Sequence, residues 1–299
     1  MNYLLHLGIY LNIYIIVALS LNLVVGYLGR LSLTHAGYVA LGGYAYALCT
    51  LKLGIGFLPI IAIAIALGVI TSLALSLPAW RFKGDSFVMI SLAVQAVIYG
   101  VIHNWTSPGA EPGTWTNLTN GPYGLAGIHK PDIFGIQFDT ISSIFALSLV
   151  VMLICATVIF ILTKSRWGLL LKCIRDDELA LRSLGKNVRL LKLQAFAFSC
   201  AMAAVAGVIY SSYVGYIDPT MASLDESILF LSILCIGGLG NFRGPILGAM
   251  TLLLLPELLR LTPIPGSYAA NVRLLVYGLL LVTVVHLRPQ GIAGEYRIE

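Results

Sequence analysis

Residues 175–187 combine acidic, apolar and small side chains in an order that favours a short docking helix. Three consecutive acids lie where a helix would begin, and acids are favoured in a first turn because they face the positive end of the helix dipole. Leucines follow at helical spacing, and Gly185 is placed to end the helix as a C-cap. The expected docking residues are Arg175, Asp176, Asp177, Glu178, Ala180, Leu184 and Gly185. The chemistry expected here is recognition of a partner protein; the alternative is a basic loop that only fixes membrane topology.

Motifs for catalysis or metal binding are missing from the sequence. A phosphate-binding loop needs G-x-x-x-x-G-K-[ST], and the nearest segment, 180–187, lacks the first glycine and the final hydroxyl residue. Neither H-E-x-x-H nor G-x-S-x-G occurs. The five cysteines show no C-x2-C spacing, so zinc sites and disulfides are not expected. We therefore expect a protein that is not an enzyme and that holds no metal or cofactor of its own.

A second group of candidate residues lies within the apolar stretches and could line a transport path. Polar side chains at membrane depth often mark such a path, although uncharged ones also hydrogen-bond between helices. A glycine-rich run implies irregular backbone lining a cavity, or close helix packing. The path candidates are Asn22, His35, Gln95, Gly237, Gly238 and Gly240. No Asp, Glu, Lys or Arg is expected deep within a long span, which argues against a proton or sodium relay.

These residues must be positioned by membrane-spanning helices. The chain of 299 residues is 59% hydrophobic and 10% charged, whereas soluble domains carry about 25% charged residues. Nine hydrophobic segments are expected to form helices: 3–25, 36–52, 57–80, 85–103, 141–163, 193–215, 226–240, 244–261 and 271–288. We predict one all-α polytopic membrane domain over residues 1–299, with about 8–10 transmembrane helices, some of them short or broken by glycine. The first segment is interpreted as a true span, because no Lys or Arg precedes Arg30 as a signal peptide would require.

The distribution of charge predicts the orientation. Segment 164–192 carries eight bases and three acids, whereas loop 104–140 carries one base, Lys130, and three acids. Cytoplasmic loops collect Lys and Arg, so segment 164–192 is expected inside and loop 104–140 outside. The amino terminus then faces out and the carboxyl terminus faces in. The net charge of +5 reflects this bias and does not indicate nucleic-acid binding.

Several motifs carry a family resemblance. Segments 165–187, 192–199, 203–207, 217–219, 227–228, 236–249 and 288–292 resemble the Liv-type branched-chain amino acid ABC-transporter permeases, and segments 81–87 and 119–125 resemble the LivM-like branch. The similarity spans about residues 20 to 293. Glu178, Ala180 and Gly185 match the coupling-helix pattern of ABC importers, with a spacing one residue longer than usual. Cys235 and the run 85–87 depart from the family pattern and put the identity of the substrate in doubt.

The resemblance implies a function and a set of partners. Such a permease moves a small solute inward across the bacterial plasma (inner) membrane, and two cytoplasmic ATPase subunits bind ATP and Mg. A second, homologous permease subunit, expected to form a heterodimer with this chain, and an external solute-binding protein complete the assembly. The substrates of this family include branched-chain and other amino acids, urea and short amides. The alternative left open is a secondary transporter of a small polar solute that works alone.

The external loop supplies candidate contacts for such a binding protein. Loop 104–140 is rich in Gly and Pro turn signals and carries aromatic side chains, which are favoured anchors at protein interfaces. The candidate contacts are Trp105, Trp115, Tyr123 and Asp218. The alternative for the aromatic rings is a belt at the membrane interface.

Overall fold

The computed structural model describes residues 2–82, 84–133, 135–260, 278–279 and 291–293. Most of the expected ninth segment, 271–288, lies outside these residues. The helices are α1 (Asn2–Asn22), α2 (His35–Leu48), α3 (Phe57–Thr71), α4 (Leu73–Ser76), α5 (Asp85–Asn104), α6 (Ile141–Lys164), α7 (Arg166–Asp176), α8 (Glu178–Ser183), α9 (Val188–Val214), α10 (Leu224–Gly237) and α11 (Arg243–Arg260). Single turns of other helix types lie at η1 (Leu23–Tyr27), η2 (Cys49–Leu53), η3 (Pro78–Trp80), η4 (Gly121–Tyr123) and η5 (Pro219–Ala222).

The predicted class, an all-α polytopic membrane protein, is confirmed. Among the described residues, five helical stretches are long and apolar enough to cross a membrane: Asn2–Tyr27, Phe57–Ser76, Asp85–Asn104, Ile141–Lys164 and Val188–Val214. The strands are pairs of two residues each, β1 (Leu125–Ala126) with β4 (Tyr216–Ile217) and β2 (Asp132–Ile133) with β3 (Ile136–Gln137), all antiparallel. The total of about 8–10 crossings stays a prediction.

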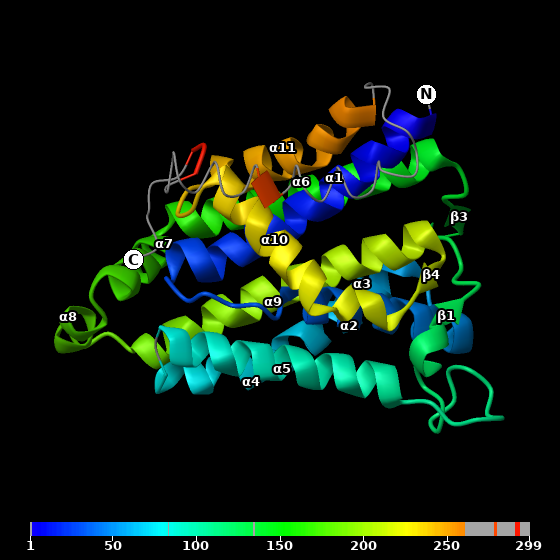
Figure 1. The fold of residues 1–299 in the computed structure, drawn as a ribbon, viewed down its shortest axis with the longest axis horizontal. Helices are drawn as coiled ribbons and strands as arrows, with labels where there is room; N and C mark the ends of the chain where they lie inside the picture. The colour runs from blue at the N-terminus through cyan, green and yellow to red at the C-terminus, as the bar shows by residue number, and fades with distance from the viewer. Residues whose placement is uncertain (1, 83, 134, 261–277, 280–290, 294–299) are drawn as a thin grey trace.

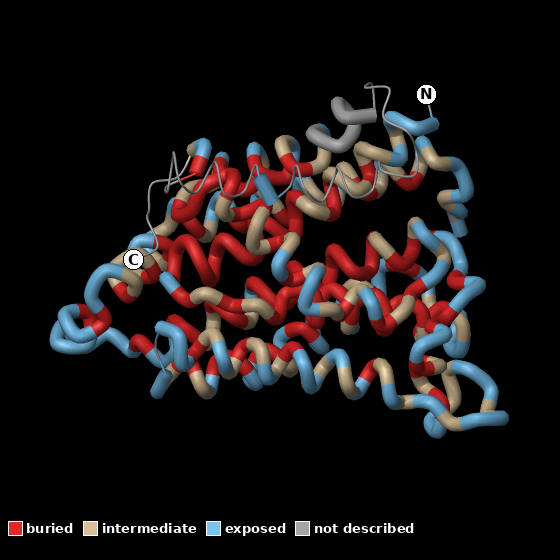
Figure 2. Tube along the Cα trace, viewed as in Figure 1, coloured by how far each residue is buried: buried red, intermediate tan, exposed pale blue. Residues whose placement is uncertain are grey.

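The centre of the molecule is built from α1, α2 and α9. These helices are buried over most of their length, and α9 packs against α2, α3 and α1 (Figure 2). By contrast, α3, α5 and α6 leave most of their apolar side chains exposed or partly exposed. Exposed apolar surface on a helix of this length is suited to lipid. The central helices therefore form the protein core, and the outer helices form the surface that meets the bilayer.

Two short helices, α2 and α10, are interrupted: each begins part-way through the molecule. Gln95 is the eleventh of the 20 residues of α5, about 15 Å from each end at 1.5 Å per residue. Its amide oxygen accepts a hydrogen bond of 3.1 Å from the backbone N–H of Gly37, in the first turn of α2. Its amide nitrogen donates to the carbonyls of Ala222 at 2.5 Å and Ser223 at 3.3 Å, just before α10. Both helices therefore begin at the level of the middle of α5.

The two interrupted helices run in opposite directions from this level. In Figure 1, α2 runs toward the end of the molecule that holds the strand pairs, and α10 runs toward the end that holds α7. Ser227 in the first turn of α10 accepts a hydrogen bond of 3.4 Å from the backbone N–H of Ala36 at the start of α2. The prediction of short or broken segments is thus confirmed for the second and seventh hydrophobic stretches.

Charged residues lie near the beginnings of α9 and α10, which are not positions deep within a long span. α9 begins at Val188, five residues before the expected start, because Asn187 caps it by accepting a hydrogen bond of 3.2 Å from the N–H of Leu190. This extension brings Lys192 into the helix, where its side chain is fully buried. The first turn of α10 also carries Asp225 and Glu226 at the depth of the middle of α5.

The loops gather at two opposite ends of the molecule. α7 and α8 lie at one end, and the strand pairs lie at the other, together with the start of α1 (Figure 1). The pairing of β1 with β4 joins loop 104–140 to the residues just before Asp218, with Leu125 opposite Ile217. The two segments expected to share one surface are therefore adjacent in space.

Candidate functional site

The docking helix expected near residue 177 is α8. Asp177 is its N-cap: its Oδ1 accepts hydrogen bonds from the N–H groups of Leu179 at 2.8 Å and Ala180 at 3.1 Å. These bonds satisfy donors that a helix start otherwise leaves unpaired. After the helix, Gly185 has a φ of +74°, a conformation that side chains other than glycine adopt at a cost. A short acidic segment is thus turned into a compact helix with defined ends.

The leucines of α8 divide between two environments. Leu181 is buried and belongs to the main apolar core. Leu179 and Leu184, in contrast, are 69% and 75% exposed, and Ala180 is exposed beside them. Two large apolar side chains at a tip that projects from the molecule form a surface that a partner protein can cover.

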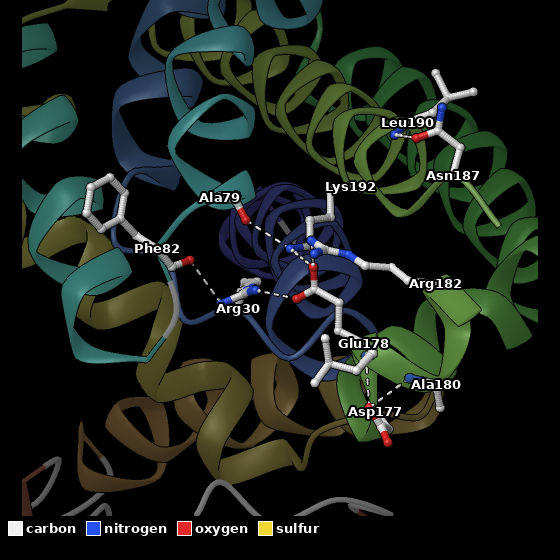
Figure 3. Close-up of polar contacts among 11 residues, drawn as sticks. Arg30, Ala79, Phe82, Asp177, Glu178, Ala180, Arg182, Asn187, Leu190 and Lys192 are labelled. Carbon is white, nitrogen blue, oxygen red and sulfur yellow. Dashed lines mark hydrogen bonds and ion pairs between the residues drawn. The ribbon is translucent and has the colours of Figure 1, made fainter. Parts of the chain in front are cut away.

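Glu178 faces inward, unlike its neighbours on α8. Its Oε1 accepts hydrogen bonds from Arg182 at 2.5 Å and from Lys192 at 2.9 Å, and its Oε2 accepts one from Arg30 at 3.3 Å (Figure 3). The side chains of Glu178, Lys192 and Arg30 are 4%, 0% and 8% exposed. We call these four residues, Arg30, Glu178, Arg182 and Lys192, the Glu178 cluster. Glu178 was expected on the docking surface. Its side chain is instead buried in the protein, which corrects that expectation.

The Glu178 cluster ties α8 to three other parts of the chain. Lys192 donates a hydrogen bond of 2.9 Å to the carbonyl of Ala79 in η3, and Arg30 donates one of 3.1 Å to the carbonyl of Phe82 (Figure 3). Arg30 lies in the connection between α1 and α2, and Lys192 lies in the first turns of α9. A displacement of α8 would therefore act directly on the start of α9 and on the segment that leads to α2.

One carboxylate in this cluster meets three cations; two of them also donate to backbone carbonyls, and the third, Arg182, is 45% exposed. Burial lowers the pKa of Arg30, and the Glu178 carboxylate acts in the opposite direction. Removing one partner from a buried ion pair costs about 3–5 kcal/mol because it leaves an uncompensated charge. From the sequence, Arg30 and Lys192 count only toward the positive charge that sets membrane orientation. Their pairing with Glu178 was missed. Their positions in sequence give no signal of it, since they lie 148 and 14 residues from Glu178.

Arg175 anchors the end of α7 beside α8. It donates a hydrogen bond of 2.9 Å to the carbonyl of Gly26 and pairs with Asp176 at 2.9 Å. A cavity of about 260 Å³ lies between these elements and is lined by Leu28, Gly29, Arg30, Ile174, Arg175, Asp176, Asp177, Glu178 and Leu179. The expected docking segment therefore borders a hollow, next to the exposed leucines, that a partner side chain could enter.

Comparison with known proteins identifies the family. A family model described as the permease component of branched-chain amino acid transport systems matches residues 3–285. The chain belongs to this family. The high-affinity branched-chain amino acid permease protein LivM of Escherichia coli strain K12 is 32% identical over 303 residues, covering 94% of this chain and 67% of that protein.

Two more distant relatives extend the comparison. The probable branched-chain amino acid permease protein LivM of Methanocaldococcus jannaschii is 25% identical, covering 96% of this chain and 92% of that protein. The autoinducer 2 import permease protein LsrC of Salmonella typhimurium is 28% identical over 184 residues, covering 60% of this chain and 49% of that protein. No solved structure matches.

The residues expected to line the transport path make hydrogen bonds where the interrupted helices α2 and α10 meet their neighbours. Asn22 Oδ1 accepts a hydrogen bond of 3.1 Å from the N–H of Gly240, and its Nδ2 donates one of 2.7 Å to the carbonyl of Asn241. His35 Nε2 and Ser199 Oγ are 2.8 Å apart. Gln95 bridges the starts of α2 and α10, as described above. Asn22 thus holds the glycine-rich turn, and the transport role of these side chains stays a prediction.

The glycine-rich run forms the turn between α10 and α11. A Cβ atom on Gly237 would lie 2.0 Å from the carbonyl oxygen of Gly244, so only glycine allows this close approach. Gly238 and Gly240 have φ values of +107° and +82°. Residues near the end of the chain pack on the same turn: the N–H of Ile292 donates a 2.9 Å hydrogen bond to the carbonyl of Ile236. Close packing therefore explains Gly237 without a transport role.

The residues proposed as contacts for an external binding protein differ in their exposure. Trp115 and Tyr123 are each 79% exposed. Trp105 is partly buried; its indole N–H donates a 2.8 Å hydrogen bond to the carbonyl of Trp115, and the two rings meet edge to face. Asp218 caps η5 by accepting hydrogen bonds from the N–H and hydroxyl of Thr220 at 3.1 and 2.5 Å. Trp115 and Tyr123 are thus available to a partner, whereas Trp105 and Asp218 make internal hydrogen bonds that shape the surface.

Proposed function

We propose that this permease is the membrane-spanning subunit of an ATP-driven importer that carries branched-chain or other amino acids inward. The observation that carries this proposal is α8, which presents Leu179 and Leu184 to solvent while Glu178 ties the helix to the spans. A helix that only fixed topology would need neither exposed leucines nor a buried ionic link to three elements. Membership of a family described as a transport permease component supports the same function.

The proposed assembly contains a second, homologous permease subunit, two cytoplasmic ATPase subunits and an external solute-binding protein. ATP and Mg bind to the ATPase subunits, and this chain transmits movement without catalysing hydrolysis. Its place is the bacterial plasma membrane, and nucleic acid has no role. The names of the relatives from Escherichia coli and Methanocaldococcus jannaschii support branched-chain amino acids as the first substrates to test.

Reconstitution tests the proposal directly. The solubilised chain should co-purify with two soluble ATPases and a second permease, and the complex in liposomes should take up leucine only when ATP is hydrolysed. A non-hydrolysable ATP analogue is the control, and it should leave uptake at background. Recovery of the chain without ATPase subunits, together with uptake that does not depend on ATP, would contradict the proposal.

A stand-alone secondary transporter is the second candidate. Asp225 and Glu226 favour it, because carboxylates at membrane depth are typical of ion-coupled transport. This candidate requires that a proton or sodium gradient alone drives uptake by the isolated chain. Dissipating the gradient with an ionophore in the presence of ATP separates the two functions: an importer driven by ATP continues, and a secondary transporter stops.

We propose that the end with α8 faces the cytoplasm and that the amino terminus faces out. The basic segment 164–192 supports this orientation. In intact cells, single cysteines introduced at residues 108–135 should react with a membrane-impermeant thiol reagent, whereas native Cys173 should react only after the cells are opened. The opposite pattern would reverse the topology and place α8 beyond the reach of a cytoplasmic ATPase.

Replacement of Trp115 by alanine is expected to weaken activation by the external binding protein. The ring is 79% exposed, and the hydrogen bond from Trp105 goes to its backbone carbonyl, so the substitution should leave the loop folded. An aromatic anchor in an interface contributes about 2 kcal/mol or more, so binding-protein-stimulated ATP hydrolysis should fall about tenfold or more at subsaturating binding protein. Trp115→Phe is the matched control and should keep most of the activity. Unchanged stimulation in Trp115→Ala would favour the membrane-belt interpretation.

A further inference from the structure

A cavity lies beside the point at which α10 begins. It has a volume of about 260 Å³ and is lined by Leu92, Gln95, Ala96, Tyr99, Ala222, Ser223 and Leu224. Its wall is largely apolar, since Leu92, Ala96 and Tyr99 recur along one face of α5 at helical spacing. Gln95 places the cavity at the middle of α5, which is half the depth of a crossing helix.

The surroundings of this cavity are unusual for a lipid-facing groove. Two helices, α2 and α10, begin beside it, held together through Gln95 and through Ser227. Helices interrupted at membrane depth are tolerated where the irregular backbone is covered by protein or lines a water-filled cavity. In transporters built from discontinuous helices, the substrate binds near the midplane at the ends of such half-helices.

Two carboxylates follow the cavity-lining Leu224 in the chain, although neither lines the cavity itself. Asp225 comes next in the chain after Leu224 and is exposed, and Glu226 is partly buried. Glu226 lies close enough to Tyr10 and Tyr210 for their groups to interact electrostatically. Within the described part of the chain, neither carboxylate forms an ion pair. A charged group at this depth is costly in lipid and is tolerated beside water or a cation.

We propose that this cavity is the site at which a neutral amino acid with an aliphatic side chain is held at mid-membrane during transport. The side chain of the substrate occupies the apolar space between α5 and α10, and its ammonium group is attracted by Asp225 in the first turn of α10. The shape and charge of the site are complementary to such a molecule: an apolar hollow of side-chain size next to negative charge. This inference rests on the proposed function and adds the position of the substrate and the residues that select it.

Cysteine labelling tests whether the cavity is a water-accessible path. Ala96→Cys lies on the cavity wall, whereas the matched control Val97→Cys is one residue further on the same helix, 64% exposed and outside the cavity. In the assembled transporter, methanethiosulfonate ethylammonium should label Ala96→Cys above the level of the five native cysteines, and leucine should slow that labelling severalfold. Val97→Cys should not react, because the reagent modifies thiols in water. Equal labelling of both positions, or none at Ala96→Cys because a second permease covers the cavity, would overturn the proposal.

Substrate selection tests the same cavity through function. Ala96→Phe fills the apolar space, so with binding protein saturated by each amino acid in turn, the ratio of leucine to alanine uptake should fall about tenfold. Val97→Phe adds the same ring outside the cavity and should leave the ratio unchanged. Asp225→Asn should slow uptake of both amino acids, and Asp225→Glu should restore it. An unchanged ratio in Ala96→Phe would overturn the site. If the parent complex took up no amino acid at all, the proposed function would fail, while the labelling pattern would still report on the cavity.

Discussion

Replacement of Glu178 by lysine is expected to destabilise the chain and to abolish transport. In the folded protein this carboxylate is the only acid in contact with Arg30, Arg182 and Lys192 among the described residues. The substitution would bring a fourth cation into a site that already holds three, two of them buried. Loss of one partner from a buried ion pair costs about 3–5 kcal/mol, and here two buried cations lose theirs. The free energy of unfolding, measured by thermal or denaturant melting in detergent, should fall by at least that amount.

The matched control for this substitution is Asp176→Lys. It makes the same change of charge two residues earlier, but the side chain of Asp176 is 63% exposed, so its pair with Arg175 is open to solvent on the side of the carboxylate. Surface pairs contribute about 0–1 kcal/mol, so the chain should stay folded and should retain its spans. Equal stability of the two variants would show that the Glu178 cluster is not a structural link. The sequence placed Glu178 among the docking residues; because its carboxylate points inward, its replacement is expected to act on the fold.

Replacement of Gly185 by valine is expected to impair coupling while leaving the membrane domain folded. The residue has a φ of +74°, which a β-branched side chain adopts at a cost of about 1–3 kcal/mol. A Cβ atom at this position would meet no neighbour within 4 Å, so the effect arises from backbone conformation and not from a clash. Relief of the strain would move the end of α8 and with it Leu184. ATPase association and leucine uptake should fall on the order of tenfold, as a strain of this size allows.

Gly185→Asn provides the control for the conformational argument. Asparagine adopts positive φ more readily than other residues with a side chain, and the space around position 185 is open. This variant should therefore retain most of the uptake, while melting of the spans should be the same in both variants. If the valine and asparagine variants were equally active, α8 would not need a residue of positive φ at its end. The docking role of this segment would then be wrong.

The class of the protein could be predicted from the sequence because it depends on composition and on the length of apolar runs. Segments 57–80 and 141–163 contain no charged residue and are long enough to cross a bilayer, and both are membrane-length helices in the structure. The position of α8 also followed from local chemistry, since Asp177 caps the helix and Gly185 ends it through bonds and angles within a few residues. Features of this kind depend on neighbours in the chain, and a single sequence contains them.

The direction of Glu178, the burial of Lys192 and the interrupted starts of α2 and α10 were decided by the tertiary structure alone. Each depends on groups far apart in the chain: Glu178 meets Arg30 across 148 residues, and Gln95 joins Gly37 to Ala222 across 185 residues, the sum of separations of 58 and 127. Hydropathy averages over about 20 residues, so it identifies a span but does not show where the backbone breaks within it. Likewise, the sequence shows a charged residue near the end of a span only as a contribution to membrane orientation. Its ion-pair partner becomes visible only in the folded structure. Local patterns therefore determined which segments are helices, and long-range contacts between polar groups determined where those helices begin and which charges meet.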